Sequence, residues 1–116
     1  MKADINGKEI GFSHGLYFIG KAQKELGKDL FELVDELGKN TLSFLPDLMY
    51  LSIKVDAELD DKQPLIKKRE FIEYLENSKD LSDAEGIGAR FISEFSKSIK
   101  VNLPVNEDDG DGVKKK

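Results

Sequence analysis

The stretch that decides the fold is residues 42–59, which read LSFLPDLMYLSIKVDAEL. As a helix, this stretch would carry apolar side chains on almost every side, which is typical of a helix enclosed by its neighbours. Ser43 is the predicted N-cap, because Pro46 then falls in the first turn, where a missing N–H costs little. Asp47, Lys54 and Asp56 interrupt the run, whereas a bilayer span needs about 20 consecutive apolar residues. We therefore predict the core helix of a small soluble protein.

Composition narrows the class of protein. The chain has 116 residues, which favours one domain, and we place it at 1–103, followed by a disordered acidic and lysine tail at 104–116. The absence of cysteine excludes disulfides, thiolate zinc sites and thiol nucleophiles. The net charge of −5 argues against a nucleic-acid partner. The sequence does not open with the pattern of a signal peptide, and its apolar runs are too short to span a membrane. We therefore expect a cytoplasmic location.

The first element predicted along the chain is a β-hairpin at its N-terminal end. Asn6-Gly7 suits the positive backbone angles of a tight type I′ turn. A two-residue loop at this dipeptide gathers the apolar residues on one face of the hairpin, whereas a three-residue loop mixes the faces. The pairs that this register predicts are Ile5 with Lys8, Ala3 with Ile10 and Met1 with Phe12.

Two helices are expected between the hairpin and residue 42. Ser13 is the predicted cap of the first, which Gly27 ends. The box formed by Asp29 and Glu32 opens the second, and Gly38 is its predicted left-handed cap. The apolar side of this second helix is Leu30, Leu33, Val34 and Leu37.

Two more helices are expected after the core helix, at 65–77 and from a capping box at 82–85 onward. Gly86 and Gly88 interrupt the first turns of the last helix at roughly 1 kcal/mol each relative to alanine, which indicates that another backbone approaches closely there. The predicted fold is mainly α, with an N-terminal β-hairpin followed by a compact bundle of about five helices. The last helix has an apolar residue at every fourth position: Ile87, Phe91, Phe95 and Ile99.

The sequence offers little that points to catalysis. His14 is the single histidine and has no metal-ligand spacing around it, so an exposed or capping role is expected. The pairs Asp60-Asp61 and Asp108-Asp109 fall in a predicted loop and tail, where nothing would shift their pKa values. We therefore predict no catalytic, cofactor-binding or metal-binding residue, and a protein that is not an enzyme.

The order of the elements carries a resemblance to a known family. Ile5-Asn6-Gly7-Lys8-Glu9-Ile10 predicts a strand, turn and strand ahead of a helix, and Leu45-Pro46-Asp47-Leu48-Met49-Tyr50 lies in an apolar central helix. A charged helix from Lys68 to Asn77 precedes the last amphipathic helix. Over most of Met1 to Leu103, this arrangement resembles the small tail assembly chaperones of long-tailed bacteriophages.

The resemblance implies a function and a set of partners. Members of that family bind the tape measure protein, keep it soluble and help recruit tail tube subunits, so a place in the host cytoplasm and absence from the mature virion are expected. Many members also have a longer form made by ribosomal frameshifting, for which Lys114-Lys115-Lys116 would supply an A-rich slippery stretch. The alternative is a small regulatory or inhibitory protein-binding module of a phage or mobile element.

The predicted partner-binding residues are Tyr50 on the core helix and Phe91, Phe95 and Ile99 on the last helix. The competing interpretation is that the apolar residues of the last helix form a stripe that simply closes the bundle. Self-association is also expected, because apolar surface left uncovered in so small a chain tends to be covered by a copy of itself.

Overall fold

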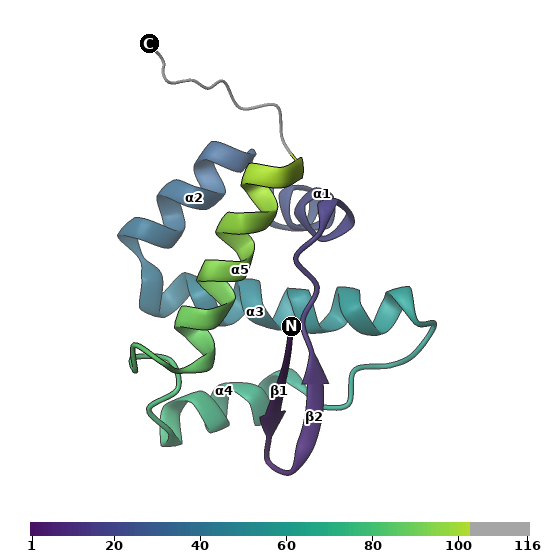
Figure 1. Ribbon diagram of the computed structural model, residues 1–116, viewed down its shortest axis with the longest axis vertical. Coiled ribbons are helices and arrows are strands. Elements are labelled where there is room, and N and C mark those ends of the chain that lie inside the picture. The colour runs from purple at the N-terminus through teal and green to yellow at the C-terminus, as the bar shows by residue number, and fades with distance from the viewer. Residues whose placement is uncertain (103–116) are drawn as a thin grey trace.

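The computed structural model describes residues 1–102, so the predicted tail at 104–116 lies outside the described residues. A two-stranded antiparallel hairpin and five helices make up this part of the chain, which confirms the predicted fold class (Figure 1). The elements are β1 (Lys2–Ile5), β2 (Lys8–Gly11), α1 (Leu16–Leu26), α2 (Leu30–Lys39), α3 (Thr41–Leu59), α4 (Lys68–Asn77) and α5 (Ile87–Asn102).

The hairpin has the predicted register. Ala3 lies opposite Ile10, and Ile5 lies opposite Lys8. Asn6 and Gly7 both have positive φ angles, of 54° and 79°, as a type I′ turn requires. Ile5 and Ile10 are almost fully buried, at 0% and 1% exposed, so the face chosen by the register is the face that packs on the helices.

α1 begins later than predicted. Gly15 stands at the N-cap, and no side chain caps the helix, so the prediction of Ser13 as the cap was wrong. The Ser52 hydroxyl on α3 donates a 2.6 Å hydrogen bond to the Ser13 carbonyl and holds this residue against the core helix. The other end is as predicted, because Gly27 adopts the left-handed conformation with φ 64°.

α2 starts at the predicted box and ends beyond the predicted residue. Asp29 and Glu32 each accept a 2.8 Å hydrogen bond from the other's backbone N–H. The helix continues through Gly38 to Lys39, so the prediction of Gly38 as its cap was wrong. Asn40 takes that place, because its backbone and side-chain amides both donate to Glu36, and its ψ of 47° breaks the helix.

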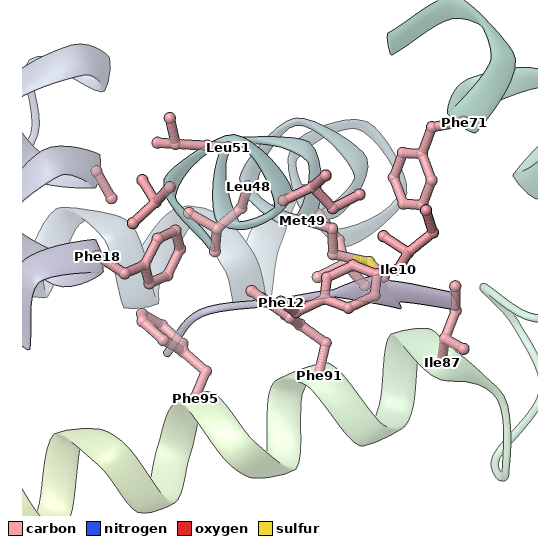
Figure 2. Close-up of a cluster of buried hydrophobic side chains, with 14 of the residues drawn as sticks. Ile10, Phe12, Phe18, Leu48, Met49, Leu51, Phe71, Ile87, Phe91 and Phe95 are labelled. Atoms are coloured by element: carbon pink, nitrogen blue, oxygen red, sulfur yellow. The ribbon is translucent and has the colours of Figure 1, made fainter. Parts of the chain in front are cut away.

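α3 is the predicted central helix, although its start differs. It begins at Thr41 with Asn40 at the N-cap, so Ser43 lies inside the first turn and not at the cap. Pro46 is therefore inside the helix rather than near its free N–H groups. Leu48 and Met49 of α3 point toward the hairpin and α5, whereas Leu51, also buried, points to the opposite side of the helix (Figure 2).

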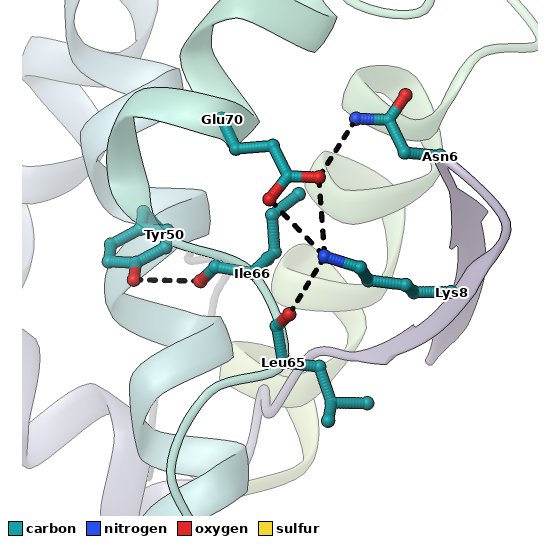
Figure 3. A network of polar contacts seen from close by, with 6 residues as sticks. All are labelled: Asn6, Lys8, Tyr50, Leu65, Ile66 and Glu70. Atoms are coloured by element: carbon teal, nitrogen blue, oxygen red, sulfur yellow. Dashed lines mark hydrogen bonds and ion pairs between the residues drawn. The ribbon is translucent and has the colours of Figure 1, made fainter.

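α4 begins at Lys68 and not at Leu65, because tertiary contacts hold the preceding segment in a non-helical bend. The Tyr50 hydroxyl donates to the Ile66 carbonyl at 2.9 Å, and Lys8 Nζ donates to the Leu65 carbonyl at 3.2 Å (Figure 3). Lys8 also pairs with Glu70 in the first turn of α4 at 3.3 Å, which ties the hairpin to this helix.

α5 begins at Ile87, so the predicted capping box at 82–85 does not open the helix. Asp83 instead accepts hydrogen bonds from the backbone N–H groups of Glu85 and Gly86, which makes a turn. The predicted close backbone approach at Gly86 is confirmed. A Cβ atom on Gly86 would lie 2.8 Å from the Cα atom of Asp80, in the turn between α4 and α5.

Candidate partner-binding surface

The predicted partner-binding stripe of α5 lies in the core. Phe91 and Phe95 are 0% and 1% exposed. Figure 2 shows both rings pointing from α5 toward the hairpin and α1. The ring of Phe91 lies 6.1 Å from that of Phe12, and the ring of Phe95 lies 6.0 Å from that of Phe18. These two side chains close the bundle, as the competing interpretation predicted, and a partner docking on this conformation does not reach them.

The other two predicted residues remain partly accessible. Ile99 is half-buried and packs against the core cluster. Tyr50 is also half-buried, and burial raises the pKa of its phenol. Its hydroxyl is committed to the Ile66 carbonyl, whereas its ring borders a surface hollow. The structure therefore does not bring the four predicted residues together. Tyr50 lies on a different surface from the residues of α5.

That surface runs along α3 and consists of two hollows, which we call the α3 groove. The first hollow, of about 200 Å³, is bordered by α1, α3 and the start of α4. The second, of about 410 Å³, is bordered by the end of α3 and the loop that follows. Lys54 lines both hollows, so the two hollows adjoin at this residue. The residues of the groove are Glu25, Leu26, Asp47, Tyr50, Leu51, Lys54, Glu58, Asp61, Lys62, Gln63, Pro64 and Lys68.

Charges of both signs border the α3 groove. Lys68 pairs with Asp47 at 3.1 Å beside the first hollow. Tyr17 on α1 donates a 2.6 Å hydrogen bond to Glu58, and Lys21 lies 3.5 Å from the same carboxylate. The hydrogen bond from Tyr17, aided by Lys21, lowers the pKa of Glu58 below its usual value. The first hollow thus has an apolar floor at Leu26, Tyr50 and Leu51, whereas the second is lined by charged and polar residues and Pro64. An apolar floor beside ionised residues suits an amphipathic peptide.

A second uncovered surface lies on α2, and we call Phe31, Val34 and Gly38 the α2 face. Phe31 is 84% exposed and Val34 is 48% exposed, whereas Leu33 of the same helix is fully buried. Val34 was predicted to lie on the apolar side of this helix with Leu33, and Phe31 was not singled out. A signal for Phe31 was available, because it lies roughly 100° from Leu30 around the helix and so falls outside the predicted apolar side.

His14 differs from its expected exposed or capping role. Its ring is partly buried, 5.2 Å from the ring of Phe91, and within residues 1–102 its Nε2 atom is buried without a hydrogen-bond partner. Burial lowers the pKa of His14 from 6.5 to about 4; the N-terminal amino group acts in the same direction, and Glu94 opposes both. The ring is therefore neutral at pH 7 and packs as part of the core.

His14 makes a testable contribution to the pH dependence of stability. Because its pKa is lower in the fold than in the unfolded chain, its contribution is complete above pH 6.5 and is lost as the pH falls toward 4. The loss is at most about 3 kcal/mol, and partial exposure of the ring reduces it. Urea unfolding at several pH values should show a shallower decline for His14→Gln than for the wild type. Parallel curves would contradict the assignment.

Within 1–102, no three His, Asp or Glu side chains are grouped so that they could hold a metal ion. No helix in this part of the chain is long and apolar enough to cross a membrane. Comparisons with models of protein families, with curated proteins and with solved structures found no match.

Proposed function

We propose that this chain is a tail assembly chaperone of a long-tailed phage, which binds a helix of the tape measure protein in the α3 groove. The groove is the observation that carries the proposal. Its apolar floor and paired charges match the requirements of an amphipathic helix, which buries one side and leaves the other in water. In this role the chain binds and protects its client without a chemical step, and then passes it to the tail tube subunits.

The architecture supports the same proposal. An N-terminal hairpin followed by five helices around an apolar central helix is the arrangement on which the family resemblance rests. Tyr50 keeps the partner-binding role predicted for it, now together with Leu26 and Leu51. The role of Phe91 and Phe95 in this proposal is to hold the bundle that supports the groove.

Co-expression with a tape measure fragment tests the function. The fragment should be soluble when the wild-type chain is present and insoluble without it. Lys54→Glu should weaken binding about tenfold, because it removes the cation shared by the two hollows and leaves Glu58 near a second carboxylate. Pull-down and isothermal titration calorimetry measure the change.

A matched control separates the groove from the overall charge. Lys79→Glu reverses an exposed lysine that lines neither hollow, and it should bind the fragment as the wild type does. Equal binding by the Lys54→Glu variant would exclude the groove as the site. Failure of every tape measure fragment to depend on the chain would reject the chaperone function itself.

A further inference from the structure

The α2 face combines a large exposed side chain with an unfilled position. α2 lies at the edge of the molecule (Figure 1). Phe31 is 84% exposed, and a Cβ atom added at Gly38 would meet nothing within 4 Å. The first residue projects an aromatic ring into water, and the second leaves room for a ring on the same helix.

The spacing of these residues gives the face a particular symmetry. Phe31 and Gly38 are seven residues apart, which is roughly 10 Å along the axis and about 20° short of two full turns. Glu32 and Lys39 have the same separation on the neighbouring flank. The N-terminal end of the helix thus carries a projecting ring and a negative charge, at Phe31 and Glu32. The C-terminal end carries an open position and a positive charge, at Gly38 and Lys39.

We propose that the α2 faces of two copies of this chain pack against each other, antiparallel, about a two-fold axis close to Val34. This single operation places Phe31 of each copy over Gly38 of the other. It also brings Glu32 of each copy to within roughly 3 Å, measured along the helix axis, of Lys39 of the other. In such an interface, residue i contacts j and j contacts i, so one self-complementary surface serves both partners. The antiparallel arrangement also sets the two helix dipoles in opposite directions.

Charge near the axis limits the strength of this dimer. Asp35 of the two copies would come close to each other, although each carboxylate is already paired with Lys39 of its own helix at 3.1 Å. The α2 face is also small beside a standard interface of about 800 Å² per partner. We therefore expect a dissociation constant on the order of 100 µM. The pairing does not depend on the proposed function, because the α3 groove contains no residue of α2.

Sedimentation equilibrium of the full chain up to about 1 mM tests the pairing. The wild type should dimerise, and Phe31→Asp should remain monomeric while keeping its circular dichroism spectrum. Gly38→Leu should raise the melting temperature, because glycine is unfavourable inside a helix, yet weaken association at least tenfold by filling the gap. Leu65→Asp, at a residue that is 65% exposed outside α2, is the matched control and should dimerise normally.

Cysteine cross-linking tests the direction of the pairing, since the chain has no cysteine of its own. Val34→Cys should form a disulfide-linked dimer with itself. Phe31→Cys should cross-link to Gly38→Cys in a mixture and not to itself. Self-cross-linking of Phe31→Cys would indicate parallel helices, and a wild-type monomer at 1 mM, or a dimer unaffected by Phe31→Asp, would overturn the proposal.

Discussion

Replacing Phe91 with alanine is expected to lower the free energy of unfolding by about 3 to 5 kcal/mol. The ring is 0% exposed and lies 6.1 Å from Phe12, 6.2 Å from Phe18 and 6.1 Å from Phe95. It therefore joins the hairpin, α1 and α5 in one aromatic cluster. Its removal leaves a cavity among three elements that cannot all move inward, so a large part of the packing energy is lost.

The control for this substitution is the same change at a solvent-exposed phenylalanine. Phe31→Ala should alter the stability of the monomer by no more than about 0.5 kcal/mol, because the ring is 84% exposed. Urea unfolding at low protein concentration, followed by circular dichroism, measures both variants below the concentration of the proposed dimer. If Phe91→Ala and Phe31→Ala were equally stable, the packing of α5 against the core would be contradicted.

Replacing Gly86 with alanine is expected to destabilise the fold by about 2 to 3 kcal/mol. The added Cβ atom would lie 2.8 Å from both the Cα atom and the carbonyl carbon of Asp80. These are backbone atoms, so relief requires the whole turn between α4 and α5 to shift. Phe91 and Phe95 follow on the same helix, and a displaced α5 would carry both rings out of position.

A second glycine provides the opposite expectation. Gly20 lies inside α1, is exposed, and has nothing within 4 Å of an added Cβ atom. Gly20→Ala should therefore raise the free energy of unfolding by about 0.5 to 1 kcal/mol, because alanine loses less backbone entropy in a helix. Thermal and urea unfolding should show changes of opposite sign at the two positions. A gain in stability at Gly86 would contradict the close contact with Asp80.

The contrast between Phe31 and Phe95 shows why a partner surface is hard to derive from sequence. Both residues are phenylalanines on amphipathic helices. Phe95 is enclosed because Phe18 and Phe91 meet it, whereas Phe31 lies on the side of α2 that no other described element covers. The periodicity of a helix reports which residues share a side, and it does not report what packs against that side.

The features that could be predicted from the sequence are those whose physical cause lies within a few neighbouring residues. These are the register set by Asn6-Gly7, the left-handed stop at Gly27, the box of Asp29 and Glu32, and the enclosed helix at residues 42–59. Each depends on local backbone angles, local hydrogen bonds or a continuous apolar run. These local preferences are the same wherever the segment lies in the fold.

The remaining helix starts and the exposed surfaces depend on contacts between distant parts of the chain. Ser13 is not a cap because α1 begins at Leu16, and a hydrogen bond from Ser52, far along the chain, holds the Ser13 backbone against α3. The segment at Leu65 and Ile66 is a bend and not a helix, because Lys8 bonds the Leu65 carbonyl and Tyr50 bonds the Ile66 carbonyl. A local capping preference is about 1 kcal/mol, so a few long-range hydrogen bonds and buried rings outweigh it. The same packing buried Phe91 and left the α3 groove and the α2 face exposed to solvent.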